Sequence, residues 1–156
     1  KHAKQGGDIF ENCLKLCCIS PSSIMLKKQI FADIGGFDEN LPACEDYDMW
    51  LRICAFEPVI FLDKKLLFKY GGHDDQLSKK FWGMDRFRIY SIEKLISTSN
   101  LSRSKTIMAL KVLIQKINIL IIGGQKRDNS EVVMVYTQKL KKWSSFLEEH
   151  KLFPNY

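Results

Sequence analysis

The amino-acid sequence predicts an α/β fold in which a few short strands with flanking helices are followed by a helical extension. Two observations carry this prediction. Short apolar runs rich in strand formers alternate, in the first half of the chain, with segments whose apolar residues recur every three or four positions. From residue 84 onward, every periodic segment is helical. We therefore predict two domains, residues 1–83 and residues 84–156.

The composition of the 156 residues, 46% hydrophobic and 27% charged, is typical of a globular protein. A chain of this length buries about two thirds of the surface that its unfolded form exposes, so it needs no disulfide or structural metal. The net charge of +6 suits an anionic partner, such as a nucleotide sugar, a lipid phosphate or a membrane surface. The basic residues alternate with apolar ones instead of forming a run, which argues against nucleic-acid binding.

The sequence contains five cysteines, Cys13, Cys17, Cys18, Cys44 and Cys54, and no signal-peptide pattern precedes them. An odd number in this context favours free thiols in a reducing compartment, and we expect a cytoplasmic protein. The spacing of the first three places them on one helix face. A zinc site would need a fourth ligand at a suitable interval, which the sequence lacks.

The first elements follow from helical spacing and glycine stops. Apolar residues recur at helical intervals from Asp8 to Cys18, and Asp8, which follows two glycines, is the expected N-cap. The apolar run Ile24–Leu26 predicts a buried strand, and Lys27–Ile34 predicts a short helix. Gly35-Gly36 is expected to stop that helix.

A helix and two strands are expected next. Apolar residues at helical spacing predict a helix over Tyr47–Phe56. The runs Val59–Leu62 and Leu66–Tyr70, separated by a short polar turn, are apolar and rich in strand formers. We predict that they pair as a hairpin.

Three helices are expected in the extension. The first begins near Met84, the second ends at Gly123-Gly124, and the third carries apolar residues from Val133 to Leu147. The last two are expected to pack as an antiparallel pair. The most apolar stretch, Ile107–Ile122, contains two lysines and is shorter than the roughly 20 residues that a bilayer demands, so we predict no membrane span.

The third helix of the extension also combines basic and aromatic residues. Four lysines lie near two aromatic residues, and the set is Lys139, Lys141, Lys142, Lys151, Trp143 and Phe146. Such a helix suits a membrane interface, so peripheral association with the cytoplasmic face of a membrane is one interpretation. A helix that packs on its own domain is the other.

The segment from Gly35 to Arg52, GGFDENLPACEDYDMWLR, carries the acidic residues that point to chemistry. Glu45 and Asp46 stand at the mouth of a helix, whose dipole stabilises their charged forms. An ionised carboxylate in a cleft can take a proton from an attacking hydroxyl, and a helix cap is the alternative role. Asp48 and Arg52, four residues apart, are spaced for an ion pair on the helix.

This pattern, a helix ending in Gly-Gly-Phe-Asp-Glu, a loop and then Glu-Asp-Tyr-Asp-Met-Trp-Leu-Arg, resembles the acceptor-site segment of family-2 glycosyltransferases of GT-A fold. The resemblance covers roughly residues 20–78, and the helical tail is similar to the extension of many bacterial members. It implies that the chain is the carboxyl-terminal half of an inverting transferase, with a partial GT-A sheet. The donor-binding half would then lie upstream of Lys1.

The resemblance also implies roles for single residues. Asp46 occupies the position of the general base that activates the acceptor hydroxyl, and Glu45 would shape the acceptor pocket. Asp48 and Arg52 would anchor the helix. The substrate-binding set that the resemblance implies comprises Glu45, Asp48, Arg52, Trp50, Ser22 and Ser23.

A metal is implied as well. His73, in the glycine-hinged loop after Tyr70, would lie near the nucleotide diphosphate as a ligand of Mg²⁺ or Mn²⁺, and an exposed loop histidine is the alternative. Asp46-Tyr47-Asp48 has the form of the family's metal-binding Asp-x-Asp motif. That motif follows an apolar strand, however, whereas a loop precedes these residues here. Most metal ligands are therefore expected in the donor-binding half.

These implications predict transfer of a sugar from a nucleotide-diphospho-sugar donor to a glycan or lipid-linked saccharide, as in polysaccharide biosynthesis. The alternative is a non-catalytic module or fragment that binds a glycan or a partner protein and lacks the donor-binding half. Without the donor-binding half, we expect the isolated chain to be inactive. The incomplete sheet would also expose unpaired edges and apolar surface, so we expect the isolated chain to self-associate.

Overall fold

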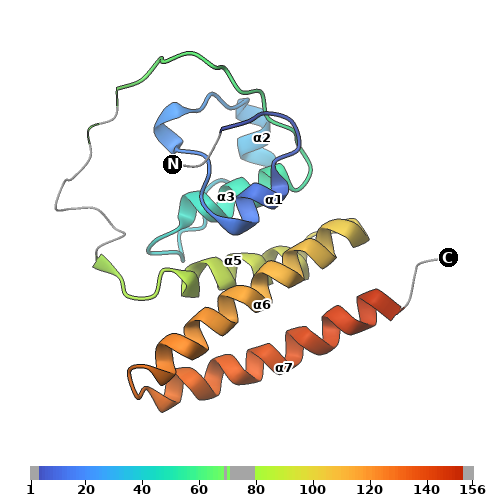
Figure 1. Ribbon diagram of the computed structural model, residues 1–156. Coiled ribbons are helices and arrows are strands. Elements are labelled where there is room, and N and C mark those ends of the chain that lie inside the picture. The colour runs from blue at the N-terminus through green and yellow to red at the C-terminus, as the bar shows by residue number, and fades with distance from the viewer. Residues whose placement is uncertain (1–3, 69, 71–79, 153–156) are drawn as a thin grey trace. The chain divides into compact units, whose positions relative to one another are not determined.

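The computed structural model describes residues 4–68, 70 and 80–152 (Figure 1). The chain divides into two compact units, one that ends at Phe87 and one that begins at Arg88. The roles predicted for the two domains stay predictions. The helices are α1 (Phe10–Lys15), the 3₁₀ helix η1 (Pro21–Ser23), α2 (Lys28–Asp33), α3 (Glu45–Cys54), α5 (Asp85–Thr98), α6 (Arg103–Gln125) and α7 (Ser130–Leu152).

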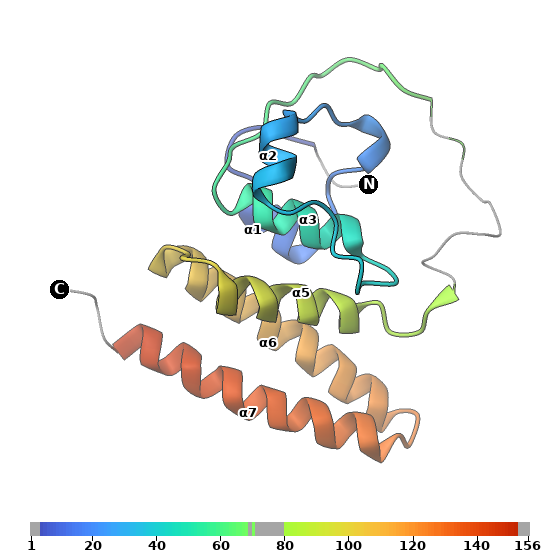
Figure 2. The ribbon, with the colours of Figure 1, turned by 180° about the vertical axis from the view of Figure 1, so that it is seen from behind.

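In the N-terminal unit, α1 packs against α3 (Figure 2). Phe10 and Leu14 of α1 are buried, as are Trp50 and Leu51 of α3, so that two short helices share one apolar core. Tyr47 is also buried, and its Oη donates a hydrogen bond to the carbonyl of Leu14 at 2.7 Å. Burial of these large side chains stabilises a helix as short as α1, which would not persist by itself in water.

Helix α1 is shorter than the sequence predicts. It begins after Ile9, and Asp8 Oδ1 accepts from the backbone N of Phe10 at 3.1 Å without serving as the N-cap. Leu16 is extended, with φ −157° and ψ 162°, and ends the helix. Cys17 and Cys18 therefore follow the helix instead of sharing a face with Cys13, because the backbone leaves the helical conformation before reaching them.

Helices α2 and α3 begin and end within two residues of the predicted positions, and glycines end α2 as expected. Gly35 and Gly36 have φ values of 74° and 69°, in the region that favours glycine. The N–H groups of Gly35 and Gly36 donate to the carbonyls of Ala32 and Phe31, both at 3.0 Å. The chain thereby reverses direction and enters the loop that leads to α3.

The three expected strands are not formed in the described part of the chain. Residues 24–27 and 60–68 form loops, and the one ladder contact among the described residues is an antiparallel bridge between Gly7 and Val59. Met25, in the first apolar run, is 98% exposed and not buried. An apolar run becomes a buried strand only when neighbouring strands pair with it, and the described residues supply none. The sheet prediction is therefore not confirmed.

In the C-terminal unit, α6 and α7 pack side by side in antiparallel directions, as predicted (Figure 1). Helix α6 continues through Gly123-Gly124 to Gln125, so these glycines do not stop it as expected. Gly124 allows close packing instead, because a Cβ there would lie 3.0 Å from Cγ2 of Val133. The direction of the chain changes in the turn that follows, where Asp128 has φ 52°.

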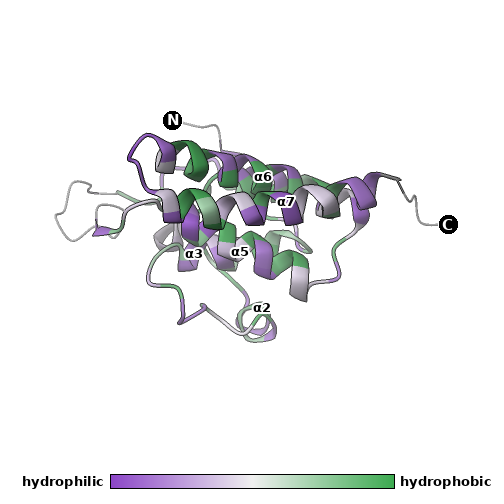
Figure 3. Ribbon diagram, turned by 90° about the horizontal axis from the view of Figure 1, so that it is seen from below, coloured by the Kyte–Doolittle hydropathy of each residue, from purple (hydrophilic) through white to green (hydrophobic). Residues whose placement is uncertain are grey.

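Helix α6 is 23 residues long, and by length and composition it could cross a membrane. Hydrophobic residues recur along it between hydrophilic ones (Figure 3). The prediction of no membrane span rests on the apolar segment Ile107–Ile122 alone, and α6 extends beyond this segment at both ends. Half of its most apolar 18 residues are nevertheless buried inside the protein, as in a core helix.

Part of the basic and aromatic set on α7 serves packing within its own unit. Trp143 is buried, and its Nε1 donates to Oε1 of Glu93 at 2.7 Å. Lys139 Nζ lies 2.8 Å from the same oxygen. Glu93 of α5 thus accepts hydrogen bonds from two residues of α7. This is the arrangement expected for a helix that packs on its own domain, which is the alternative to docking on a membrane.

Candidate active site

The acidic segment lies in the first turn of α3. The N-cap, Cys44, has a left-handed backbone conformation with φ 64° and makes no side-chain capping hydrogen bond. Its carbonyl accepts from the N–H of Asp48 at 3.0 Å, which closes the first turn. Glu45 and Asp46 are half-buried, while Asp48 is 1% exposed. Two of the three carboxylates can therefore reach solvent or a ligand, and the third belongs to the core.

Asp46 is oriented by two hydrogen bonds. Its Oδ1 accepts from the N–H of Tyr47 at 2.7 Å, and its Oδ2 accepts from the thiol of Cys17 at an Sγ–Oδ2 distance of 3.2 Å. Burial, and then the neighbouring Asp46 carboxylate, raise the pKa of Cys17 well above that of an ordinary thiol. The thiol therefore keeps its proton and acts as a donor. A carboxylate accepts about four hydrogen bonds, so Asp46 retains acceptor capacity for a substrate hydroxyl.

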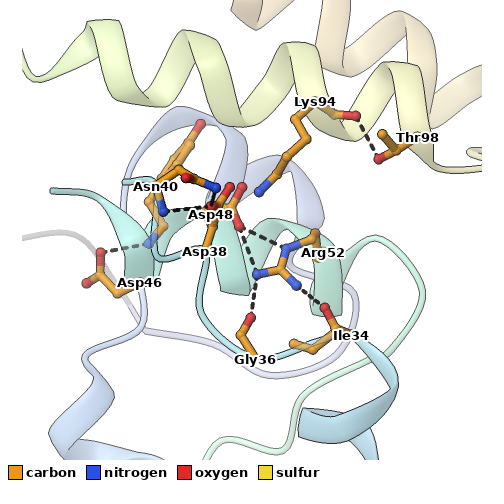
Figure 4. Close-up of polar contacts among 10 residues, drawn as sticks. Ile34, Gly36, Asp38, Asn40, Asp46, Asp48, Arg52, Lys94 and Thr98 are labelled. Atoms are coloured by element: carbon orange, nitrogen blue, oxygen red, sulfur yellow. Dashed lines mark hydrogen bonds and ion pairs between the residues drawn. The ribbon is translucent and has the colours of Figure 1, made fainter. Parts of the chain in front are cut away.

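Asp48 and Arg52 form the predicted ion pair. Oδ2 of Asp48 accepts from Nε and Nη2 of Arg52, at 2.9 and 2.8 Å (Figure 4). Nη2 also donates to the carbonyl of Gly36 at 2.7 Å, and Nη1 donates to the carbonyl of Ile34. The guanidinium thus joins α3 to the end of α2, and it satisfies carbonyls that the helix and the glycine turn leave open.

The loop between α2 and α3 has its own hydrogen bonds. Oδ1 of Asp38 accepts from the backbone N of Asn40 at 3.0 Å and from its Nδ2 at 3.1 Å (Figure 4). The N–H of Leu41 donates to the carbonyl of Asp38 at 3.1 Å, which forms a turn. This turn and the Arg52 contacts fix the path by which the chain enters α3, and with it the position of Asp46.

The other predicted substrate-binding residues are placed differently. Trp50 is 2% exposed and lies in the core, so it supports α3 from within. Ser22 and Ser23 are exposed on η1, where Oγ of Ser23 donates to the carbonyl of Ser20 at 3.0 Å. His73 lies outside the described residues. The part that each of these residues takes in substrate binding stays a prediction.

The described residues do not fit a metal ion. Among them, no three His, Cys, Asp or Glu side chains are grouped so that they could hold a cation. Asp48, the second acid of the Asp-x-Asp pattern, is buried against Arg52. A buried carboxylate paired with a guanidinium is not available to Mg²⁺ or Mn²⁺.

No local sequence pattern indicates that Cys17 lies beside Asp46. The two residues are 29 positions apart, and no motif spacing marks a tertiary contact of this kind. Cys13 and Cys18 are a second pair that spacing does not reveal, with their sulfur atoms 3.2 Å apart. Both contacts follow from the tertiary fold of the N-terminal unit and not from the spacing of the cysteines in the sequence.

Comparison with known proteins places the acidic segment in a family. A sequence profile described as "Glycosyltransferase like family 2" matches residues 9–90, a span that contains all of the candidate site residues. No solved structure matches the chain significantly.

Curated relatives come from rickettsiae. A Rickettsia felis protein named "Uncharacterized glycosyltransferase" is 40% identical over 58 residues, which are 37% of this chain and 10% of that protein. A similarly named Rickettsia conorii protein is 38% identical over 58 residues, covering 37% of this chain and 9% of its own length. The chain therefore aligns with about a tenth of the length of these relatives.

Proposed function

Since this chain belongs to the family described as "Glycosyltransferase like family 2", we propose that it forms the acceptor side of an inverting glycosyltransferase with Asp46 as general base. The observation that carries the proposal is the placement of Asp46. Its carboxylate is half-buried at the N-terminus of α3 and is oriented by donors on both oxygens. A base aligned in this way loses little orientational freedom when an acceptor hydroxyl arrives.

The proposed reaction is a single displacement. The acceptor hydroxyl donates its proton to Asp46 while its oxygen forms a bond to the anomeric carbon of the donor sugar. The bond from that carbon to the diphosphate breaks, and the nucleoside diphosphate leaves with the electron pair. Attack opposite the leaving group inverts the configuration at the anomeric carbon. General-base assistance of this kind contributes about 10²- to 10⁴-fold in rate.

The surrounding residues take supporting roles in this proposal. Cys17 and the N–H of Tyr47 orient the carboxylate. Arg52, through Asp48 and the carbonyl of Gly36, keeps α3 in register with the glycine turn. Half-buried Glu45 lies next to Asp46, where it would shape the pocket for the acceptor.

The donor in this proposal is a nucleotide-diphospho-sugar, and the acceptor is a glycan or a lipid-linked saccharide. Family resemblance implies Mg²⁺ or Mn²⁺ at the diphosphate, with His73 as one ligand. Because the described residues do not form such a site, no step of the proposed reaction passes through a metal. Asp46 and the residues that orient it act on the acceptor alone.

The proposal is tested on the complete translated product of the gene, assayed for hydrolysis of a panel of nucleotide sugars with manganese. Asp46→Asn is compared with the wild type, and Asp33→Asn, which changes an exposed acid on α2, is the matched control. We expect turnover of one donor that collapses in Asp46→Asn and persists in Asp33→Asn. If the protein binds no nucleotide sugar, the proposal of an enzyme is overturned in favour of a glycan- or partner-binding module.

A further inference from the structure

Two cysteines next to the candidate site lie close enough to react with each other. Cys13 is on α1 and is 1% exposed, whereas Cys18 is half-buried in the loop that follows that helix. Their sulfur atoms are 3.2 Å apart, with one thiol hydrogen-bonded to the other sulfur. A disulfide bond is about 2.05 Å long, so a movement of about 1 Å would bring the two sulfurs to bonding distance.

We propose that Cys13 and Cys18 form a redox-sensitive dithiol that hydrogen peroxide or an organic hydroperoxide converts to a disulfide. Such a pair requires one cysteine that an oxidant can reach and a second cysteine that is protected from it. Cys18 is half-buried and so more open to a small oxidant than Cys13, which is buried in the core. The backbone changes from helical to extended at Leu16, so the loop can absorb the movement while buried side chains retain α1.

The local environment favours Cys18 as the attacking sulfur. Its pKa is lowered to about 7, first by the hydrogen bond from Cys13 and further by a backbone hydrogen bond and the positive charge of Lys4. Lys4 Nζ also donates to the carbonyl of Cys18. The thiolate is the form that reacts with peroxides, so the lowered pKa increases the reactive fraction of Cys18 at neutral pH.

The chemistry balances in two steps. The Cys18 thiolate attacks one oxygen of the peroxide, the O–O bond breaks, and Cys18 becomes a sulfenic acid while the other oxygen leaves as hydroxide, which takes up a proton to form water. The sulfur of Cys13 then attacks the sulfur of Cys18. The S–O bond breaks, and the departing hydroxyl leaves as water with the proton of Cys13. Two thiols are oxidised, and one hydrogen peroxide is reduced to two waters; an organic hydroperoxide leaves as an alcohol in the first step and gives one alcohol and one water.

The other cysteines are poorer partners. The thiol of Cys17 donates a hydrogen bond to Asp46, and burial raises its pKa, so Cys17 is not the thiolate that attacks the oxidant. Cys54 also lies within reach of Cys13, and its contact is one cause of the raised pKa of the Cys13 thiol. Cys54 is 1% exposed, however, so an oxidant in solution meets Cys18 first. A disulfide between Cys13 and Cys54 is the competing product.

The dithiol also lies beside the proposed base, because Cys18 follows Cys17 in the chain and Cys17 contacts Asp46. This consequence rests on the proposed function. Drawing Cys18 toward Cys13 changes the path of the loop at Cys17, so oxidation is expected to weaken the contact between Cys17 and Asp46 and to lower the rate of sugar transfer.

Peptide mapping tests the dithiol without any assay of activity. The purified 156-residue chain is treated with hydrogen peroxide, its remaining thiols are alkylated, and it is digested with trypsin. Cleavage after Lys15 separates Cys13, in peptide 5–15, from Cys18, in peptide 16–27. We expect these two peptides to be linked, with the loss of two hydrogen atoms, and to separate again after reduction.

Single variants identify the sulfurs. Cys18→Ser is expected to abolish the link between peptides 5–15 and 16–27, and the matched change Cys17→Ser is expected to preserve it. A second sample oxidised in urea should show many pairings, which distinguishes folded geometry from random oxidation. A link that survives Cys18→Ser, a dominant link from peptide 5–15 to peptide 53–64, or equal mixtures in folded and unfolded samples would each overturn the proposal.

The effect on catalysis is measured separately in the complete gene product. We expect peroxide to lower sugar transfer by the wild type, dithiothreitol to restore it, and the Cys18→Ser variant to resist. Equal inactivation of both proteins would overturn the regulatory effect. A protein that transfers no sugar before oxidation would refute the proposed function, while the mapping result would still decide the dithiol.

Discussion

The thiol of Cys17 donates a hydrogen bond to Oδ2 of Asp46, with 3.2 Å between sulfur and oxygen. This contact joins the loop after α1 to the first turn of α3, and it orients the carboxylate that we propose as the base. The backbone N–H of Tyr47 orients the other oxygen from the helix itself. The carboxylate of Asp46 is therefore positioned jointly by a local and a distant group.

Loss of the thiol donor should slow sugar transfer without abolishing it. A hydrogen bond contributes about 0.5–1.5 kcal/mol net, so we expect Cys17→Ala to lower kcat by about two- to tenfold. Cys17→Ser keeps a donor at this position and should retain most of the activity. Steady-state kinetics of the two variants provide the check. Equal losses in both variants would show that sulfur size, and not the hydrogen bond, matters at this position.

Arg52 should contribute strongly to the stability of the N-terminal unit. Arg52→Ala leaves the 1% exposed carboxylate of Asp48 without its guanidinium, and breaking a buried pair of this kind costs about 3 kcal/mol. Urea unfolding followed by circular dichroism measures the loss. Lys15→Ala is the matched control, because the pair of Lys15 with Glu11 is more than half exposed and should contribute less than about 1 kcal/mol. Similar losses for both variants would contradict the structure.

The two glycines after α2 should differ in their tolerance of alanine. Both have positive φ, so either substitution is expected to cost about 1 kcal/mol of backbone strain. A Cβ on Gly36 would also lie 3.1 Å from the ring of Phe31, whereas one on Gly35 would meet no atom within 4 Å. Gly36→Ala should therefore lower the free energy of unfolding by about 1 kcal/mol more than Gly35→Ala. Equal values for the two variants would contradict the packing of Phe31.

Alkylation of Cys18 should depend on pH in the neutral range. Its pKa is lowered to about 7, and only the thiolate reacts, so the rate of iodoacetamide labelling should be half-maximal near pH 7 and fall below it. Cys13→Ala removes the hydrogen bond that is the main cause of the lowered pKa of Cys18, so the pH midpoint of labelling in this variant should move upward. Fragmentation of peptide 16–27 separates Cys18 from Cys17, which should stay unlabelled. A midpoint near that of a free thiol in both proteins would refute the assigned environment.

Local patterns located α2 and α3 and predicted one ion pair. Periodic apolar residues located α3 to within two residues, and the four-residue spacing of Asp48 and Arg52 predicted their contact. Glycine was a less reliable signal. Gly35-Gly36 ends α2, but Gly123-Gly124 lies inside α6, where Val133 of α7 packs close to Gly124. Whether a glycine stops a helix depends on its tertiary neighbours.

Sequence patterns failed where pairing or distance along the chain decides the outcome. The apolar runs after Pro58 have the composition of strands, but strand formation depends on a partner, and Ile60 and Phe68 are about nine-tenths exposed among the described residues. The contact between Cys17 and Asp46 spans 29 residues and follows from the packing of α1 on α3. Neither outcome is encoded in a short window of sequence.

The rate of sugar transfer to an acceptor by Asp46→Asn, in the complete gene product, tests the central claim most directly. Asparagine keeps the size of the side chain and cannot take a proton, so we predict a fall in kcat of about 10²- to 10⁴-fold with donor binding retained. Glu45→Gln, which changes the neighbouring carboxylate, should cost far less. Transfer by Asp46→Asn at a rate near that of the wild type would contradict the assignment of Asp46 as the base.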